Sequence, residues 1–499
     1  MGLWASRRSN WRWLTAWWSG LSHFKQNCVI GLVIEFAIIV LELIVHPASL
    51  AWLENYALDS MMRGAASQYM VEQGDAANAR PLVLVDIDER TWRSERWGGG
   101  EPVQSPRPEL IQLVTFAAQA GAEHVVLDVL VEGKRNDAQD RAFARSFESL
   151  VGQTPSDTKF VLVRSLRLPL DAGQLAASSR AMIPEQRTSA LDDVLGRVAG
   201  RVAIAAPYFV ESSDGRVRDW ELWKVVCSDT AGSPNRNVTV MPSVQLLIAA
   251  ARLRSDLQAA APWLRAPTDG CPVDESSSSA VGDRLNKQMT DWLNLAFGLS
   301  VPVHQFVARE SGGLANRIVY RTADATRQGG ALGDSAARRL VRVSALDVLE
   351  KPDDTRRRLA GYLKGSIVVI GVTRADSYDL RRTPIGEMPG SLVVLNSIDS
   401  MLRFGLLQPP SALVMIPLVA MLIVAVAFVY ARWDSVRGTL IATFGVLFVL
   451  WAASYWFFKY GIWLNFALPL IGIQIHRIVK SIEERSELRR AVRRDDQHE

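Results

Sequence analysis

Residues 82–88 read LVLVDID, a short apolar run rich in β-branched side chains that ends in acids. Runs of this length and composition are typical of strands buried on both faces of a parallel sheet. Residues 124–130, HVVLDVL, repeat the pattern. A helix is predicted between the two runs, because Pro108 suits the first turn of a helix and Gly121 suits its end. Strand, helix and strand in this order predict a parallel pair with a helical connection.

Further segments continue this alternation. We expect additional strands at residues 159–164, 201–206 and 367–371, and additional helices at residues 137–150 and 391–403. The sequence therefore predicts an α/β domain with a mostly parallel sheet covered by helices on both faces. Two polar stretches rich in Ser, Gly and Pro, residues 171–190 and 269–279, are expected to be surface loops.

Four apolar stretches indicate a membrane protein. Residues 28–45, 412–430, 438–458 and 461–479 approach the roughly 20 residues that a helix needs to cross a bilayer. The first is interpreted as an uncleaved anchor, because its long preceding region and its two acids differ from a signal peptide. Between the first and second stretches, residues 46–411 are predicted to form one extracytoplasmic sensor domain.

Basic residues predict the direction of these helices. Residues 1–27 contain three arginines, one lysine, five tryptophans and no acid, which predicts a cytoplasmic segment along the inner membrane surface. The loop after the second stretch carries Arg432 and Arg437, and residues 480–499 form a charged tail rich in arginine. Four crossings place all three regions on one side, as the positive-inside rule requires. Both termini are therefore predicted in the cytoplasm.

The first membrane stretch contains two acids, Glu35 and Glu42, which are seven positions apart and share one helical face. An acid inside a membrane is costly, so it usually faces protein or water. One interpretation is a polar seam or ion path between helices. The other is a helix-packing contact, with Glu42 reaching the outer interface.

Polar residues gather at the predicted strand ends, where ligands bind in open parallel sheets. The candidate ligand-binding residues are Asp86, Asp88, Arg107, Asp128, Asp379, Arg381 and Asn396. One hypothesis is that they line a single crevice. The alternative is that the acids cap helices or pair with arginines.

Motifs for catalysis are missing from the sequence. No Walker loop, HExxH or GxSxG occurs, so the chain is predicted not to be an enzyme and to need no cofactor. Six scattered histidines and the lack of a CxxC pair argue against a metal site. Asp86 and Asp88 alternate along a strand and so could share a cation, which supports a weaker alternative, a periplasmic metal-dependent enzyme. The net charge of +4, without a basic stripe, argues against nucleic-acid binding.

Two of the three cysteines, Cys227 and Cys271, lie in the predicted extracytoplasmic domain. An oxidising compartment would allow a disulfide between them. The alternative is two unpaired buried thiols, because a sequence does not give the separation of their Cα atoms.

Two motif blocks resemble a known family. The first combines VLVDIDERTW at residues 83–92 with PRPELIQLVTFAAQAGAEHVVLDVLV at residues 106–131. The second is GSIVVIGVTRADSYDLRRTPIGEMPGSLVVLNSIDSMLRFG at residues 365–405. With the membrane stretches that follow, they resemble the type-two CHASE domain, an extracytoplasmic sensory module of bacterial cyclases and histidine kinases. The resemblance implies a receptor in the bacterial inner membrane whose large domain faces the periplasm.

Relatives commonly carry a cytoplasmic output domain after the last membrane helix, where we expect only the charged tail here. The resulting hypothesis is a sensor subunit that binds an unknown periplasmic ligand and signals to a separate cytoplasmic output protein. Its expected partners are the lipid bilayer and a second copy in a possible homodimer, with no nucleic acid. The alternative is a membrane effector or pore-forming component whose transmembrane bundle is itself the output.

Overall fold

The computed structural model describes most of the chain. The described residues are 21–45, 48–66, 81–100, 105–131, 138–155, 157–167, 183–187, 189–195, 197–198, 200–229, 236–252, 271, 275–298, 314–322, 340–374, 379–408, 410–458, 461–464 and 467–495. Most of the expected cytoplasmic segment at residues 1–27 and the side chain of Glu42 lie outside the described part. The chain divides into two compact units, the α/β unit (residues 62–407) and the helical unit (residues 1–61 with 408–499).

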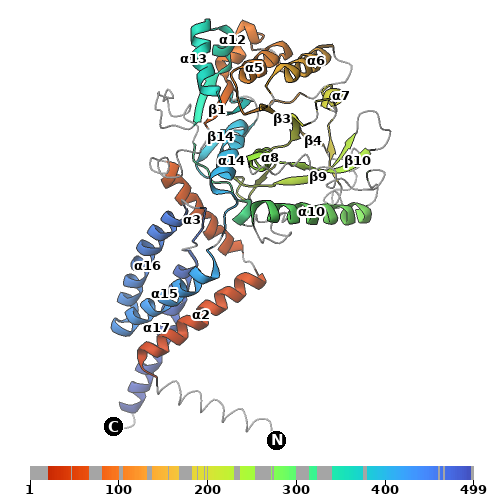
Figure 1. Cartoon of the computed structure of the whole chain (residues 1–499). Coiled ribbons are helices and arrows are strands. Elements are labelled where there is room, and N and C mark those ends of the chain that lie inside the picture. Colours follow the sequence, from red (N-terminus) through yellow and green to blue (C-terminus); the bar gives the residue numbers. More distant parts are fainter. Residues whose placement is uncertain are drawn as a thin grey trace. The chain divides into compact units, whose positions relative to one another are not determined.

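The α/β unit is built on a six-stranded sheet in the order β11-β1-β12-β2-β3-β6, in which every neighbouring pair is parallel (Figure 1). The strands are β1 (Leu82–Ile87), β2 (His124–Asp128), β3 (Lys159–Val163), β6 (Val202–Ala205), β11 (Leu340–Ser344) and β12 (Ile367–Val372). The predicted parallel sheet is confirmed. Its order inserts β12 between β1 and β2, although β12 comes last in the chain.

Helices cover both faces of this sheet, as predicted. One face packs against α5 (Arg107–Gln119), α6 (Ala138–Gln153), α12 (Ala345–Glu350) and α13 (Asp353–Leu363). Val83 and Val85 of β1 belong to that core, so the alternating Leu84 and Asp86 point to the opposite face. The opposite face is covered by α14 (Gly390–Phe404), which contacts β1 and β12 and lies beside α8 (Val244–Arg252).

The middle of the chain contains elements that the sequence pattern did not reveal. A four-stranded sheet has the order β10-β9-β5-β4, and short pairs are formed by β7 with β8 and by β13 with β14. These strands are β4 (Leu166–Arg167), β5 (Glu185–Gln186), β7 (Phe209–Glu211), β8 (Val217–Trp220), β9 (Trp223–Asp229), β10 (Arg236–Pro242), β13 (Leu380–Thr383) and β14 (Gly386–Pro389).

Two further features lie in this middle region. The surface loop expected at residues 269–279 is wrong from Glu275 onward, because helix α10 (Glu275–Phe297) begins there. Cys227 of β9 is joined to Cys271 by a disulfide, and their Cα atoms are 5.9 Å apart. The bond fixes Cys271 to β9, an inner strand of the second sheet.

The helical unit contains five long helices: α2 (His23–Val45), α3 (Ala48–Ala66), α15 (Ala412–Arg432), α16 (Ser435–Phe458) and α17 (Ala467–Asp495). The segments Leu413–Arg432 and Val436–Phe458 are long and apolar enough to cross a membrane. At the last expected span, residues 461–479, the first four residues are not helical, and helix α17 covers the rest from Ala467 and continues through the expected tail to Asp495. Helix α2 packs against α15 and α17.

Candidate functional site

The carboxyl ends of four strands form one row across the sheet. Asp86 of β1 is the register partner of Ser344 on β11 and of Gly371 on β12, and Gly371 is the partner of Asp128 on β2. Side chains in such a row point to the same face, which here is the face covered by α14. The structure therefore brings Asp86 and Asp128 to one edge, on either side of a glycine.

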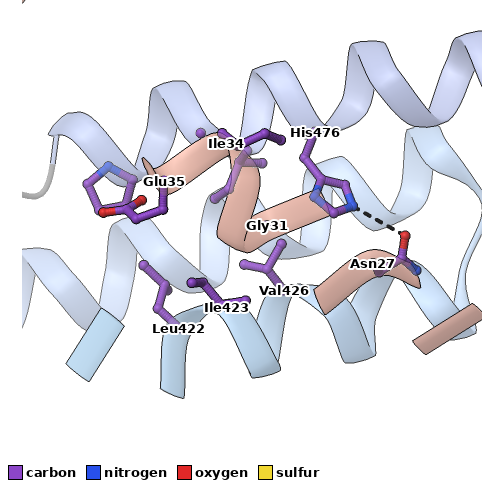
Figure 2. A pocket seen from close by; sticks show the side chains of 11 residues that line it. Asn27, Gly31, Ile34, Glu35, Leu422, Ile423, Val426 and His476 are labelled. Atoms are coloured by element: carbon purple, nitrogen blue, oxygen red, sulfur yellow. Dashed lines mark hydrogen bonds between the residues drawn. The ribbon is translucent and has the colours of Figure 1, made fainter. Parts of the chain in front are cut away.

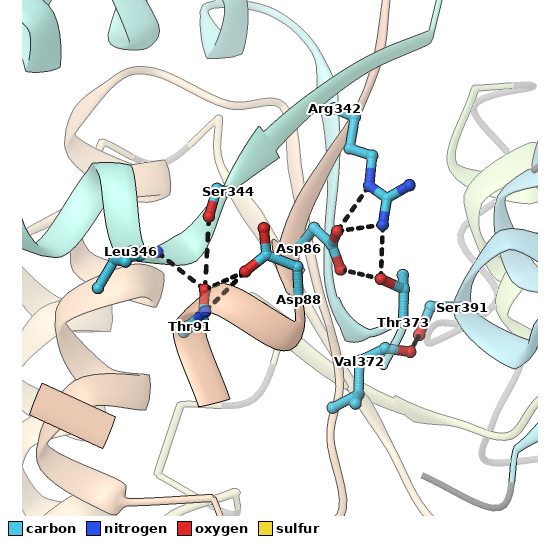
Figure 3. Close-up of polar contacts among 9 residues, drawn as sticks. All are labelled: Asp86, Asp88, Thr91, Arg342, Ser344, Leu346, Val372, Thr373 and Ser391. Atoms are coloured by element: carbon cyan, nitrogen blue, oxygen red, sulfur yellow. Dashed lines mark hydrogen bonds and ion pairs between the residues drawn. The ribbon is translucent and has the colours of Figure 1, made fainter. Parts of the chain in front are cut away.

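The Asp86 carboxylate is buried and is held by two neighbours (Figure 3). Arg342 Nε donates to Asp86 Oδ2 at 2.6 Å, and Thr373 Oγ1 donates to Asp86 Oδ1 at 2.6 Å. Arg342 Nη2 also donates to Thr373 Oγ1 at 2.6 Å. Burial raises the pKa of Asp86 to about 6, although the Arg342 guanidinium and the Thr373 hydroxyl both favour the ionised form. Each hydrogen bond of this triad suits an ionised carboxylate.

Asp88 has a structural role, because it is the N-cap of helix α4 (Glu89–Arg93). Its Oδ1 accepts from Thr91 N at 2.8 Å and from Thr91 Oγ1 at 2.7 Å. Figure 3 shows Asp86 and Asp88 engaged with different partners. The geometry lends no support to the weaker alternative of a shared cation, because β1 ends at Ile87 and the strand alternation does not extend to Asp88. Among the described residues, no group of three or more His, Cys, Asp or Glu side chains is arranged to hold a metal.

Asp128 meets a different partner. Gly371 has no side chain, and Ser391 in the first turn of α14 occupies the space above it: a Cβ on Gly371 would collide with Ser391 Oγ. The Ser391 hydroxyl donates to Val372 O at 3.3 Å, and Asp128 Oδ2 would lie 3.5 Å from the same Cβ on Gly371. Burial raises the pKa of Asp128 to about 6, the Ser391 hydroxyl opposes the rise, and the negative charge of Asp379 adds to it.

Asp379 lies against the start of the same helix. Its backbone carbonyl accepts from Gly390 N at 2.8 Å, and a Cβ on Gly390 would collide with its carboxylate. Arg381 Nε donates to Asp379 Oδ1 at 3.1 Å, while Arg381 Nη1 donates to Glu211 Oε1 at 3.1 Å. Burial raises the pKa of Asp379, although Arg381 acts in the opposite direction. Two glycines thus allow the first turn of α14 to approach both the sheet and this carboxylate.

Arg107 forms an interior contact between two helices. Its Nε lies 2.7 Å from Asp140 Oδ1, and 5% of the Arg107 side chain is exposed, so the pair joins the start of α5 to α6. Its side chain is hydrogen-bonded to Asp140 and placed beside the carbonyls of Ser105 and Leu130, and it is not hydrogen-bonded to Asp86 or Asp128, the two acids of the row. The expected role of Arg107 as a ligand-binding residue therefore has no support in this geometry.

Asn396 lies in the middle of α14 and holds a neighbouring segment. Its Oδ1 accepts from the backbone N–H groups of Arg321 and Thr322, each at 3.0 Å, and its Nδ2 donates to Thr322 O at 3.0 Å. Ser400, one turn later, accepts from Val319 N at 3.0 Å. The hydrogen bonds of Asn396 and Ser400 thus hold α14 against residues 319–322. Asn396 does not belong to the row of strand ends.

Three residues of the site were missed by sequence reasoning: Arg342, Thr373 and Ser391. Arg342 lies on β11, whose sequence LVRVS alternates as an edge strand does, so the strand itself was detectable. Thr373 and Ser391 carried no signal, because single hydroxyl residues occur throughout the chain.

A second group of polar residues lies inside the helical unit. A partly open cavity of about 40 Å³ lies between α2, α15 and α17, and it is lined by Asn27, Gly31, Ile34, Glu35, Leu422, Ile423, Val426, Pro469, Gly472, Ile473 and His476 (Figure 2). Glu35 of α2 therefore lies at the contact of α2 with α15 and α17. Gly31 permits close contact, because a Cβ on it would lie 2.9 Å from Ile423 Cγ2.

Hydrogen bonds at one end of this cavity connect α2, α15, α16 and α17. His476 Nε2 of α17 lies 3.3 Å from Asn27 Oδ1 of α2, and the His476 ring stacks on Tyr430 of α15. The Tyr430 hydroxyl lies 2.8 Å from Thr439 Oγ1 of α16. Lys480 donates to the backbone carbonyl of Tyr430. Polar contacts of this kind fix the register of helices that otherwise meet through apolar side chains.

Comparison with known families gives one match. The family model of the CHASE2 domain matches residues 33–431. The matched stretch begins within α2, contains the whole α/β unit and ends within α15. No curated protein and no solved structure matches the chain.

Proposed function

Because this chain belongs to the CHASE2 family, we propose that it is a membrane-held sensor subunit: the α/β unit detects a signal outside the cytoplasm, and the helical unit passes it to a cytoplasmic partner. The family is a sensory module of the extracytoplasmic side, and two helices of this chain are able to span a membrane. The observation that carries the orientation is the distribution of charge over the helical unit.

One end of the helical unit is basic. The contacts among Asn27, Tyr430, Thr439 and His476 bring together the start of α2, the end of α15, the start of α16 and the middle of α17. The basic residues next to these positions in the sequence are Lys25, Arg432, Arg437, Arg477 and Lys480. Positive charge marks the cytoplasmic side of membrane helices, which supports a cytoplasmic location for this end.

The opposite end of the helical unit carries the connections to the α/β unit. Gln408 N donates to Gly461 O at 3.2 Å, and Trp463 N donates to Gln408 O at 3.0 Å. Trp463 Nε1 donates to Glu54 Oε1 of α3 at 3.1 Å. The chain enters the α/β unit through α3 and leaves it just before Gln408. This arrangement supports four crossings by α2, α15, α16 and α17, with both termini on the basic side.

Impermeant thiol labelling of intact cells tests this topology. In a Cys28→Ser background, Arg93→Cys places a thiol on an exposed site of the α/β unit, and Asp434→Cys places one in the loop between α15 and α16. We expect the first to react with an impermeant maleimide in intact cells and the second only after permeabilisation. Labelling of Asp434→Cys in intact cells, with protection of Arg93→Cys, would contradict the proposal.

The cytoplasmic partner is proposed to dock on the far part of α17. This helix exposes Ile478 and Ile482 one turn apart, followed by the exposed Arg485 and Arg489. Protein partners commonly bind a helix through exposed apolar residues that are flanked by charged side chains. Co-purification from the native cell tests the idea: Arg485→Glu with Arg489→Glu should release the partner, while Arg382→Glu in the α/β unit should retain it. Retention of every partner by the α17 variant would remove the docking proposal.

The cavity beside Glu35 favours an alternative function, in which the bundle itself is a conducting or membrane-perturbing output. A cavity of about 40 Å³ accommodates a few water molecules at most, and its lining is largely apolar. Conductance recorded before and after Glu35→Gln distinguishes the two functions. A sensor is expected to show no conductance in either form, whereas a current that Glu35→Gln abolishes would establish the pore.

A further inference from the structure

An apolar cavity and two cations lie next to each other in the helical unit. Asn27 and His476 line one end of the cavity, and Glu35 and Pro469 line it further along α2 and α17 (Figure 2). Eight positions of α2 separate Asn27 from Glu35, which is about 12 Å along a helix axis. The lining is largely apolar and the cavity is partly open. Such a space suits a hydrocarbon group better than it suits water.

The two cations belong to α17 and lie at the Asn27 end. Arg477 and Lys480 follow Ile473, which lines the cavity, by four and seven positions, so all three share one helical face. Arg477 is exposed. Lys480 Nζ donates to the backbone carbonyl of Tyr430 and lies 5.4 Å from the centre of the Tyr430 ring. Positive charge is therefore held directly beside the apolar cavity.

The surroundings of this end are basic and aromatic. Five Lys or Arg residues and one acid occur in the three stretches that meet here, residues 21–27, 430–439 and 476–482. The acid is Asp434, which lies 3.8 Å from Arg437 of α16. Phe24 of α2 and Trp433 at the end of α15 are each 37% exposed. Exposed aromatic side chains at helix ends are typical of the headgroup level of a bilayer.

We propose that this site binds one phospholipid with an anionic headgroup: its phosphate lies at Arg477 and Lys480, and part of one acyl chain enters the cavity. Phosphate oxygens accept charge-assisted hydrogen bonds from guanidinium and ammonium groups. Basic pockets between membrane helices on the cytoplasmic side bind such headgroups. A cavity of about 40 Å³ holds only a short stretch of chain, and its open side leaves the rest of the chain in the bilayer.

The bound lipid would act on the helices that carry the proposed signal. It contacts α2, α15 and α17 together, and Arg477 directly precedes the exposed Ile478 on which the cytoplasmic partner is proposed to dock. Occupancy of the site therefore controls the packing and the surface of α17 at that point. The inference deepens the proposed sensor function and rests on it for its biological meaning, whereas binding itself is a property of the helical unit alone.

Native mass spectrometry of the full chain in a nonionic detergent tests the proposal. The chain is titrated with phosphatidylglycerol, with phosphatidylcholine and with glycerol 3-phosphate, which carries the phosphate without acyl chains. We expect one phosphatidylglycerol molecule to be retained at concentrations at which the other two are not. Equal retention of the two lipids, or equal retention of glycerol 3-phosphate, would overturn the proposal.

Substitution of the cations tests the position of the phosphate. Arg477→Gln should weaken phosphatidylglycerol binding about fivefold, and Arg477→Gln with Lys480→Gln about 25-fold, as expected for basic side chains at an anionic lipid. Arg437→Gln is the matched control, because Arg437 is exposed at the same end but belongs to α16, which does not line the cavity. It should bind like the wild type. An equal loss in Arg437→Gln would indicate diffuse attraction to charge and would overturn the site.

Substitution of a glycine tests the position of the acyl chain. A Cβ on Gly472, which lines the cavity, would meet Ile38 and Ile34 at the ordinary contact distances of 3.6 and 3.8 Å. Gly472→Ala should therefore fold and weaken binding about threefold, because contacts of the chain are lost. Gly445→Ala in α16, where a Cβ meets nothing within 4 Å, should bind like the wild type. Unchanged binding in Gly472→Ala would overturn the placement of the chain. None of these results depends on which side of the membrane the basic end faces, so this proposal and the topology tested by thiol labelling fail separately.

Discussion

Asp86 and Asp128 flank Gly371 in one row of the sheet, and burial raises the pKa of each to about 6. Their partners differ. Asp86 accepts hydrogen bonds from a guanidinium and a hydroxyl, both of which stabilise its charge, whereas the negative charge of Asp379 opposes ionisation of Asp128. The two acids therefore differ: Asp86 is fully buried in an ion pair that joins β1 to β11, and Asp128 is partly exposed beside the charge of another acid.

The largest loss of stability is expected from Arg342→Met, which removes the cation beside Asp86 and leaves the surroundings of Asp128 unchanged. Asp86 then stays buried without a counter-charge, and loss of one partner of a buried pair costs about 3 kcal/mol or more. The loss should shrink at low pH, because a protonated Asp86 needs no cation. Urea unfolding of the α/β unit at about pH 5 and about pH 7.5 measures both values. An equal loss at both pH values would show that Arg342 acts through packing rather than charge.

A somewhat smaller effect is expected from Gly371→Ala, which fills the space between the two acids. The new Cβ collides with Ser391 Oγ, and forced overpacking costs about 2 kcal/mol. The matched control is Gly361→Ala in α13, where a Cβ meets nothing within 4 Å, so helix propensity should stabilise the protein by up to about 1 kcal/mol. The two thermal midpoints should move in opposite directions. A neutral Gly371→Ala would mean that α14 does not pack as described.

The smallest changes in the free energy of unfolding, with opposite signs, are expected when Asp86 or Asp128 is replaced by asparagine. Asp86→Asn removes the counter-charge of Arg342 and should destabilise by about 1.5 kcal/mol. Asp128→Asn should stabilise by about 1 kcal/mol at neutral pH, because it removes an ionised carboxylate beside the negative charge of Asp379. Stability from a raised carboxyl pKa is fully present below the ordinary value of 3.8 and is lost as the pH rises through about 6, so the gain from Asp128→Asn should be smaller at pH 5 than at pH 7.5. Denaturant unfolding of both variants at the two pH values measures these changes. If both variants were stabilised, or both destabilised, at neutral pH, the claim that Asp86 and Asp128 have different roles would fail.

Prediction from sequence succeeded where a single local pattern determined the structure. Buried β-branched runs gave the central strands β1, β2, β3 and β12, because the interior of a parallel sheet admits few other compositions. The middle of the chain was missed, because its short antiparallel strands mix polar and apolar residues without a clear period. The start of helix α10 was mistaken for part of a loop, because its first residues, ESSSS, have the composition of a linker.

The candidate site was predicted only in part, because its partners come from distant parts of the chain. Asp86 and Asp128 were found from their places at strand ends, but Arg342 is 256 positions from Asp86 and Thr373 is 287 positions from it. Asp88 was misassigned because a strand pattern was extended by one residue past its end at Ile87. No local pattern distinguishes Ser391 or Asn396 from other polar residues on a helix, so their roles required the fold.

The central claim is that the helical unit passes on a signal from the α/β unit, which requires that a displacement of α14 changes α17. Hydrogen exchange of the full chain in nanodiscs, read at residues 480–495 in Gly371→Ala and in the Gly361→Ala control, tests it without any change of pH. We predict that exchange in α17 changes in Gly371→Ala together with exchange in residues 390–396, and that the control resembles the wild type. Faster exchange at the start of α14 with no change in α17 would contradict the claim.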